Sequence, residues 1–471
     1  MNRFKRFLSR KKRFWSSISI FLVLFVYISQ DFDMNLLRRP ERVFKYDILS
    51  YYAYLPGTFI LHDYTLKFIE SDPDEYYKYY WPDQLPNGNY LLMTSLGLSI
   101  MYAPFFFIAH LLAEPLGYTP NGFSAPYGTA LLFGCWVYLL CAFLLLRQIL
   151  SRYYSDRVIA FTLLIIGLTT NLLWYATAEA AMSHAFSFFL FTLFLYCTLK
   201  WYDKQSWSMT MSLGLTLGLI SLIRPTNVLV IIVFLLFGIV TWNNIKELLL
   251  LFWKNNTKLL LMAFCTFLIW VPQLLYWKSV TGQFLYYSYG SEERFFFDHP
   301  HLWQFLFGFR KGWLIYTPSM ILAIVGFYFL WKNNRKFFFP LLFFILPTIY
   351  ILSSWWCWWF GGGFGQRSMI ESYAFLSLPL AAFFSWVSQV KLKVKVPVSI
   401  LIVLICSLSG FNCLKYKRGS IHWDAMTKEA YFHHFFKPKK TDDFYLRLEH
   451  PDYKAARRGI DAVESPQNKT E

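Results

Sequence analysis

The stretch FKYDILSYYAYLP, residues 44–56, places one carboxylate, Asp47, among aromatic residues shortly after the first apolar run of the chain. That run, residues 14–29, follows a strongly basic N-terminus, residues 1–13. Because basic flanks of a membrane helix stay on the cytoplasmic side, the run is expected to cross from inside to outside. No small-residue cleavage site follows it, so we expect a retained anchor. Asp47 then lies at the outer membrane–water boundary, with Tyr51 and Tyr54 as an aromatic wall beside it.

The composition indicates a polytopic membrane protein, because hydrophobic residues make up 56% of the 471 positions and charged residues only 15%. The formal net charge of +17 would favour nucleic acid in a soluble chain. Here the basic residues gather in short loops between apolar runs, where they set membrane orientation, so no nucleic-acid partner is expected. The seven cysteines form no CxxC pair, and we expect no structural disulfide.

The next apolar run, residues 90–113, decides the orientation of everything that follows. If it crossed the membrane, the basic groups of many later loops would face outward, against the usual bias of Lys and Arg toward the cytoplasm. Pro104 interrupts the run and further prolines flank it, which fits broken helices lying in the interface. We therefore predict a long outer loop, residues 30–126, that carries interfacial helices.

Ten further apolar runs follow, each near the ~20 residues that a bilayer needs. They are 127–147, 157–176, 183–201, 207–223, 226–242, 258–277, 313–331, 337–355, 370–388 and 397–414. With the first helix they predict an all-α transmembrane bundle of about 11 spans over residues 14–414. A polar C-terminal tail, residues 415–471, then lies outside and is expected to be disordered. Lys415, Lys417 and Arg418 count against this sidedness, because they follow the last helix on the outside.

This topology brings polar side chains from distant parts of the chain to the outer face. An ionisable group near the membrane core costs about 2.5–3.5 kcal/mol on insertion scales, so such groups tend to face a polar cavity. The groups expected there are Asp47, Glu179, His184, Arg224, Arg310, Lys311 and Arg367. Five of these groups also have a simpler interpretation: a snorkelling arginine at 224, lipid-headgroup anchors at 310 and 311, and helix caps at 179 and 184.

The stretch SSWWCWWFGGGFGQR, residues 353–367, is the most unusual in the chain. Tryptophans at an outer helix end are typical of an interfacial belt, and Trp358 and Trp359 are expected to wall the site. A belt does not require the glycines that follow, which let the backbone turn sharply and approach a ligand closely. Arg367 would then bind a phosphate through two parallel hydrogen bonds from its guanidinium group. A flexible hairpin without a ligand is the alternative, since the stretch has no GK[ST] of a phosphate-binding loop.

A basic N-terminus, one helix and a long outer loop with an early aspartate resemble the GT-C superfamily of membrane glycosyltransferases, such as protein O-mannosyltransferases and bacterial aminoarabinose transferases. The likeness rests on YDILSYYAYLPG, on YATAEAAMSH and more loosely on IRPTN and FGGGFGQR, and its layout extends through about the sixth helix. It implies that Asp47 is the catalytic carboxylate and that a second acidic position falls near Glu179 and His184. This chain lacks an acidic pair at Asp47 and an aspartate at the second position, so metal dependence is not decided and a divalent cation stays one alternative.

The resemblance implies an inverting glycosyltransferase that moves a sugar from a polyprenyl-phosphate-linked donor to an envelope acceptor at the outer, periplasmic face of the bacterial inner membrane. In this interpretation the donor phosphate is held by Arg224, Arg310, Lys311 and Arg367, while Asp47 deprotonates the acceptor hydroxyl. The acceptor would be a lipid, a glycan or a protein, and membrane lipids surround the chain. Two other classes stay open: a transporter or flippase for lipid-linked sugars, and a polysaccharide ligase or polymerase.

Overall fold

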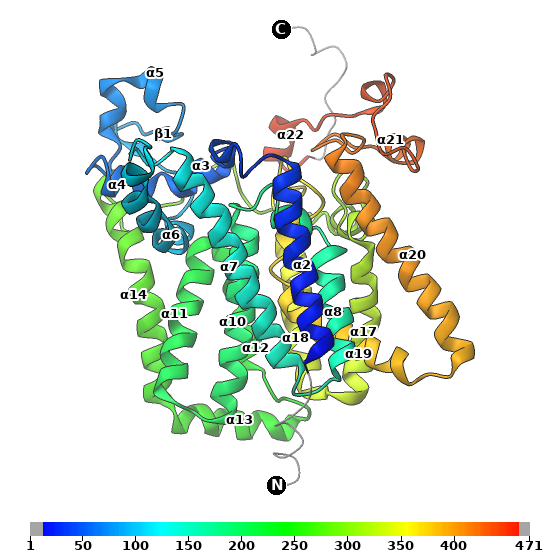
Figure 1. The fold of residues 1–471 in the computed structure, drawn as a ribbon. Coiled ribbons are helices and arrows are strands. Elements are labelled where there is room, and N and C mark those ends of the chain that lie inside the picture. Colours follow the sequence, from blue (N-terminus) through cyan, green and yellow to red (C-terminus); the bar gives the residue numbers. More distant parts are fainter. Residues whose placement is uncertain (1–12, 461–471) are drawn as a thin grey trace.

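The computed structural model describes residues 13–460 and shows long helices standing side by side, with short helices and loops gathered at one end (Figure 1). The basic residues before Arg13 and the last residues, 461–471, lie outside the described part. The longer helices are α2 (Phe14–Asp33), α6 (Gly97–Ala113), α7 (Ala125–Leu150), α8 (Asp156–Leu168), α10 (Ser183–Asp203), α11 (Trp207–Ile223), α13 (Trp242–Lys254), α14 (Asn256–Thr281), α17 (Ile321–Asn333), α18 (Arg335–Ser353), α19 (Tyr373–Gln389) and α20 (Leu392–Lys417).

Short helices join these elements and cover one end of the bundle. They are α3 (Asp47–Tyr52), α4 (Tyr54–Phe59), α5 (Pro73–Tyr76), α9 (Leu172–Tyr175), α12 (Ile231–Leu235), α15 (Leu302–Phe307), α16 (Trp313–Tyr316), α21 (Lys428–His433) and α22 (Tyr453–Arg457). The 3₁₀ turns are η1 (Pro40–Val43), η2 (Lys67–Ser71), η3 (Glu114–Leu116), η4 (Pro225–Val230), η5 (Pro318–Met320), η6 (Arg367–Met369) and η7 (Tyr445–Arg447). Residues 13–460 contain one antiparallel pair of two-residue strands, β1 (Asp83–Gln84) and β2 (Tyr90–Leu91), so the expected all-α class is confirmed.

Within the described residues, 13–460, seven helices are long and apolar enough to cross a membrane. Several predicted spans are instead divided into shorter helices where the chain carries breakers: residues 157–176 form α8 and α9, 226–242 form η4 and α12, and 313–331 form α16, η5 and α17. Pro225 and Pro318 begin two of these 3₁₀ turns, as expected for a residue without a backbone N–H. The eleven crossings therefore stay a prediction.

The segment that decides the sidedness forms α6, a continuous helix with Pro104 inside it, so the break expected at this proline is not observed. It lies at the end of the bundle that carries α3 and α4 (Figure 1) and contacts α3, α4 and α7. By length and hydropathy Gly97–Leu116 is also a candidate span. Its interfacial placement stays a prediction.

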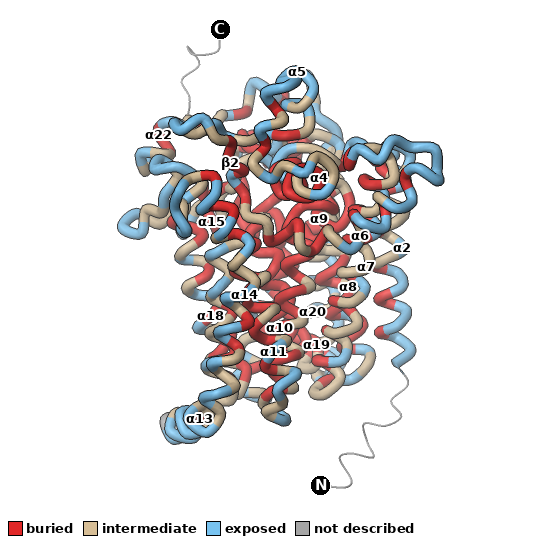
Figure 2. The backbone as a smooth tube through the Cα atoms, turned by 90° about the vertical axis from the view of Figure 1, so that its left-hand side faces the viewer, coloured by how far each residue is buried: buried red, intermediate tan, exposed pale blue. Residues whose placement is uncertain are grey.

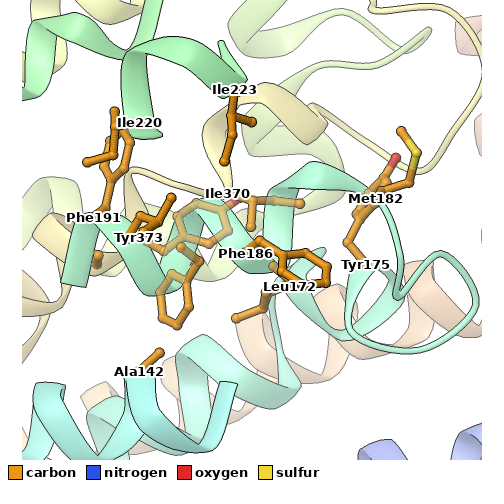
Figure 3. Packing of buried hydrophobic residues seen from close by; sticks show 14 of the residues in the cluster. Ala142, Leu172, Tyr175, Met182, Phe186, Phe191, Ile220, Ile223, Ile370 and Tyr373 are labelled. Carbon is orange, nitrogen blue, oxygen red and sulfur yellow. The ribbon is translucent and has the colours of Figure 1, made fainter. Parts of the chain in front are cut away.

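Helix α10 is the central element of the bundle, because most of its length is buried between α7, α11 and α19. The core around it is aromatic and aliphatic, and Figure 3 shows Tyr175, Phe186, Ile223 and Tyr373 packed together there. Large rings bury much apolar area and pack edge to face, which gives the bundle a rigid interior. This core supports the loops at the end of the bundle that carries Asp47.

Two helices depart from the bundle. Helix α13 lies across the opposite end, where its exposed side appears as a projecting pale blue segment in Figure 2. Its apolar residues Leu249, Leu250 and Trp253 are exposed, which is typical of an amphipathic helix lying in a membrane interface. Helix α20 leans away from the bundle (Figure 1) and is buried mainly near its C-terminal end.

The C-terminal segment, residues 418–460, is folded, so the expectation of disorder is wrong there. It forms α21, η7 and α22 and has its own hydrophobic cluster, which includes Ile421, Met426, Tyr431 and Phe444. The cluster also takes in Phe364 of the glycine-rich stretch. The composition of this segment is polar overall, and its apolar residues are spaced widely in sequence. They form a buried cluster only in the folded structure, so the sequence did not indicate it. The ESPQNKTE end lies outside the described residues.

Candidate functional site

Asp47 is the first residue of α3, at the end of the bundle where the short helices gather. The residue before it, Tyr46, has a φ of +50°, which bulky side chains rarely adopt. Such sparsely populated backbone conformations concentrate at functional sites. The Asp47 side chain is 48% exposed. The chain therefore holds an accessible carboxylate in a fixed place at the rim of the bundle.

Arg367 pairs with this carboxylate across 320 residues of sequence, with Nη2 3.3 Å from Oδ2 of Asp47. The guanidinium is mostly buried, with 18% of the side chain exposed. Burial by itself lowers the pKa of Arg367, but the neighbouring Asp47 carboxylate outweighs it, and the pKa lies above its ordinary value. The structure thus presents a permanent cation and a carboxylate side by side at one surface.

The glycine-rich stretch before Arg367 turns sharply, as the sequence predicts. Gly361, Gly363 and Gly365 all have positive φ values. A Cβ at Gly363 would lie 2.4 Å from the hydroxyl oxygen of Tyr175, so no other residue fits there without displacing that ring. The Tyr175 hydroxyl in turn accepts the backbone N–H of Phe364 at 3.1 Å. The glycines therefore fix the loop against α9 and aim Arg367 at Asp47.

A buried carboxylate that sequence reasoning missed, Glu371, lies beneath this pair. Its Oε1 accepts from Nδ1 of His184 at 3.1 Å and from Nη1 of Arg224 at 3.2 Å, and the side chain is 1% exposed. Because a carboxylate only accepts, the His184 proton sits on Nδ1 and Nε2 is left as the acceptor of the neutral ring. The signal was present in the sequence, since Glu371 is an ionisable residue at the start of an apolar run.

Tyr51 connects the two charged groups. It is 7% exposed, and both Asp47 and Arg224 act on its hydroxyl electrostatically. Burial, and then the Asp47 carboxylate, raise the pKa of the Tyr51 phenol, so it stays protonated and able to donate a hydrogen bond. Tyr289, from the loop after α14, lies within electrostatic reach of the same groups and was not predicted. The two phenols form the polar side of an aromatic wall.

The other predicted wall residues lie in a second layer. The Tyr54 hydroxyl donates to the carbonyl of Thr94 at 2.7 Å, and its ring packs edge to face on Tyr276 of α14. Trp358 and Trp359 are 2% and 1% exposed, which places them beneath the glycine-rich loop rather than on a surface. The belt interpretation of these two tryptophans does not fit their burial.

Lys311 and Arg310 support the loop. Lys311 is 2% exposed and its Nζ donates to the carbonyl oxygen of Gly363. Burial, and then the positive charge of Arg367, lower the pKa of Lys311 to about 7. The Arg310 guanidinium lies 5.1 Å above the ring of Trp359. Glu179 is half-buried and within electrostatic reach of Arg367 and Lys311, which places the second acidic position near the first.

The C-terminal segment closes over this loop. The ring of Trp423 lies against Gly362, where an added Cβ would be 3.2 Å away. The next residue, Asp424, is 1% exposed and accepts from the Tyr453 hydroxyl at 3.0 Å. Its charge acts on Lys311. Residues far along the chain therefore contribute to the electrostatics of the site.

Metal-ligating side chains come together at one place in residues 13–460, which is away from Asp47. His433, His434 and Asp443 bring one ligand atom each within 4.8 Å of the others. The Lys437 Nζ lies 3.2 Å from Nε2 of His433, and Arg447 donates to Asp443 through two nitrogens, at 3.1 and 2.9 Å. Because the protein's own cations already contact His433 and Asp443, and both ring nitrogens of His434 have neutral partners, the group is better explained as an ion-pair cluster than as a metal site.

The arrangement as a whole can bind a phosphate and move a proton. Arg367 and Arg224 supply two guanidinium groups, and Asp47 supplies an accessible carboxylate next to the first of them. Glu371 fixes Arg224 from below, and the glycine-rich loop fixes Arg367. Such preorganised charges stabilise a developing anion without reorganisation during the reaction.

No family model matches this sequence, and no curated protein matches it. Solved structures do. The archaeal oligosaccharyltransferase AglB from Archaeoglobus fulgidus, in complex with an inhibitory peptide and a dolichol-phosphate, matches with a TM-score of 0.52 and 13% identity over 91% of this chain and 60% of that chain. An oligosaccharyltransferase of the same organism in the apo form gives a TM-score of 0.49 and 14% identity over 98% of this chain and 61% of that one.

The first of these likenesses shows the fold. The chain shares the helical fold of the part of that oligosaccharyltransferase that it matches, so the all-α, GT-C-like fold class expected from the sequence is confirmed. The chain spans about 60% of the length of that neighbour.

Proposed function

We propose that the chain is an inverting GT-C glycosyltransferase that moves a sugar from a polyprenyl-phosphate-linked donor to an envelope acceptor at the outer face of the bacterial inner membrane. The observation that carries this proposal is the Asp47–Arg367 pair, 3.3 Å apart at the end of the bundle where a glycine-rich loop meets α3. A transferase of this type needs a base for the acceptor and a cation for the departing phosphate, and the pair supplies both.

The donor phosphate binds at Arg367 and Arg224 in this proposal. The donor phosphodiester, which carries one negative charge, competes with Asp47 for the Arg367 guanidinium, because bidentate pairing with phosphate suits the fork of an arginine. Donor binding thereby frees the Asp47 carboxylate to accept a proton. Lys311 and Arg310 act through the loop that they support, since Lys311 is buried against the Gly363 carbonyl.

Transfer then takes one displacement. The acceptor hydroxyl gives its proton to Asp47, and its oxygen forms a bond to the anomeric carbon. The bond from that carbon to the donor phosphate breaks, and the phosphate leaves with the electron pair. Arg367 and Arg224 stabilise the charge that the leaving phosphate gains. Attack from the face opposite the leaving group inverts the anomeric centre.

The neighbouring oligosaccharyltransferase supports the donor class, because its structure contains a dolichol-phosphate. Its inhibitory peptide supports a protein acceptor as one of the three acceptor classes, alongside lipid and glycan. The sidedness of the proposal rests on the basic residues of the N-terminus and of the short loops that the sequence places at the end opposite Asp47.

The test compares two carboxylates of the same outer loop. Cells lacking the protein are complemented with wild type, with Asp47→Asn, or with Asp74→Asn, whose side chain is exposed in α5. Free polyprenyl phosphate and envelope glycolipids are measured by mass spectrometry. Loss of a general base costs about 10²–10⁴ in rate, so Asp47→Asn should abolish transfer and Asp74→Asn should retain it. Turnover that persists in Asp47→Asn at normal membrane levels would remove this residue from the mechanism. Transport without release of polyprenyl phosphate would instead identify a flippase.

A further inference from the structure

A second polar cavity lies at the end of the bundle opposite Asp47. It has a volume of about 230 Å³, several times the ~30 Å³ that one water occupies. The end of α7, the start of α8, the last turns of α10 and the start of α2 surround it. In Figure 1 the start of α2 is at the lower end of the bundle and α3 at the upper end, so this cavity belongs to a separate site.

Three cations line the cavity: Arg13, Arg152 and Lys200. Arg152 pairs with Asp203 at 2.8 Å, and that carboxylate is 60% exposed, so the pair is of the weak surface kind. Neither Arg13 nor Lys200 forms an ion pair with a carboxylate of residues 13–460. The cavity therefore carries an excess of positive charge that the described part of the chain does not neutralise.

The one acidic residue in the lining, Asp156, is turned toward α2. Its Oδ2 accepts the backbone N–H of Trp15 at 2.8 Å, and its Oδ1 accepts the Ser16 hydroxyl at 2.5 Å. A carboxylate in this position satisfies the free N–H groups at the start of a helix and interacts with its dipole. The Asp156 carboxylate is directed at the start of α2, and one carboxylate against three cations leaves the lining with net positive charge.

The cavity lies at the depth of lipid headgroups. Phe14 and Trp15 begin α2 and are 58% and 48% exposed. The Arg157 guanidinium lies 5.9 Å above the Trp15 ring. A tryptophan with a cation over it at the first turn of an apolar helix is typical of the membrane–water boundary. A group bound among Arg13, Arg152 and Lys200 would accordingly sit where the phosphates of one leaflet are found.

We propose that this cavity binds a phosphate ester, the headgroup of an anionic phospholipid in the leaflet opposite the transferase site. Basic pockets between membrane helices bind anionic headgroups through such charges. The volume suits a headgroup rather than a whole lipid, so the acyl chains lie along the exposed apolar faces of α2 and α8. Gln148 and Tyr196 of the lining add neutral hydrogen-bonding groups for the ester oxygens.

The test measures binding to the full-length protein in detergent by native mass spectrometry. Phosphatidylglycerol and phosphatidylcholine are titrated against wild type and against Arg13→Gln/Lys200→Gln, which leaves the Arg152–Asp203 pair intact. The control is Lys391→Gln/Lys393→Gln, which removes the same charge from the start of α20 at the same end of the bundle. At about fivefold for each basic contact, the first double variant should bind phosphatidylglycerol roughly thirtyfold more weakly, and the control should match wild type.

A third arm adds inorganic phosphate to the wild-type complex. Displacement of phosphatidylglycerol by millimolar phosphate would assign the cavity to a soluble phosphate ester, and no displacement would assign it to the lipid. Equal binding of the two lipids, or equal loss in both double variants, would overturn the proposal. Should the first double variant unfold, Lys200→Gln alone is expected to weaken binding about fivefold. Because the readout is binding, failure of the transferase proposal would leave this result unaffected.

Discussion

Replacement of Glu371 tests whether the buried carboxylate positions the site. Glu371→Gln keeps the shape of the side chain and one acceptor oxygen, but removes the charge that holds Arg224 and His184. Hydrogen bonds to charged groups contribute about 1.5–3 kcal/mol each, so we expect this variant to lose about that much stability. Glu371→Ala removes both bonds and leaves a guanidinium that is only 17% exposed without its partner. The cost of breaking such a buried pair is about 3–5 kcal/mol.

The assay is equilibrium unfolding in mixed detergent micelles, followed by tryptophan fluorescence. Glu70→Gln is the matched control, because Glu70 is an exposed carboxylate of the segment between α2 and α6. A double-mutant cycle with Arg224→Gln isolates the pairwise contribution, which should exceed about 1 kcal/mol for two groups in direct contact. Transfer activity is measured on the fraction that is folded. It should fall in Glu371→Gln because Arg224 is no longer held toward the donor phosphate.

Three results would refute this reasoning. The first is a Glu371→Gln variant as stable as the Glu70→Gln control. The second is a coupling between Glu371 and Arg224 that is within error of zero. The third is full transfer activity in folded Glu371→Gln. This result would show that the Glu371 carboxylate serves only the structure and that the reaction does not need Arg224 to be held in place.

Three further predictions concern stability. Because burial and Arg367 lower the pKa of Lys311 to about 7, the unfolded chain binds one more proton than the folded one between pH 7 and about 10.5. Stability should therefore rise with pH across that window, by at most about 1.4 kcal/mol per pH unit, and Lys311→Met should flatten the rise seen in pH-dependent unfolding. Gly363→Ala should displace the Tyr175 ring and cost about 1–3 kcal/mol together with transfer activity, measured by unfolding and product release. Gly326→Ala should also destabilise, because its Cβ would lie 2.0 Å from a backbone carbonyl of α19, whereas Gly410→Ala, with open space around it, should be near neutral and serves as the control for both.

The helix positions were predictable because apolar length is the strongest signal in a membrane protein. The run 207–223 coincides with α11, and 183–201 lies inside α10. Where a helix ends inside an apolar run, the run as a whole stays apolar, so its hydropathy does not reveal the break. Thr169, Thr170 and Asn171 interrupt 157–176 in this way. The two threonine side chains bond backbone groups locally, whereas the Asn171 amide donates to the distant carbonyl of Gln366 at 3.1 Å. Such local competition with helical hydrogen bonds is hard to read from hydropathy.

Residues of the candidate site could be predicted from the sequence only where a charged residue stands out from its neighbours. Arg224 and Arg367 stand out among apolar or glycine-rich neighbours, and Asp47 was found from its place after the first helix. Glu371 was missed because it was read as part of the helix that follows it. Its role depends on α10 and the end of α11, which approach it from other parts of the chain. Pairing of this kind needs three-dimensional information, since no spacing in the sequence encodes it.

The basic residues after the last helix show why a count of charges is an incomplete guide to sidedness. Lys415 is 1% exposed, and its Nζ lies 4.4 Å from the centre of the Tyr431 ring and 5.4 Å from that of Phe435. Lys417 donates to Oε1 of Gln30 at 2.7 Å and pairs with Asp33 at the end of α2. The orientation bias acts on basic groups that face the membrane surface, whereas Lys415 lies among aromatic rings and Lys417 pairs with a carboxylate of α2. Lys415 and Lys417 are therefore weak evidence against an outer C-terminus. The remaining loops, with Arg152 and Lys200 at the opposite end, favour the sidedness that the proposed transferase requires.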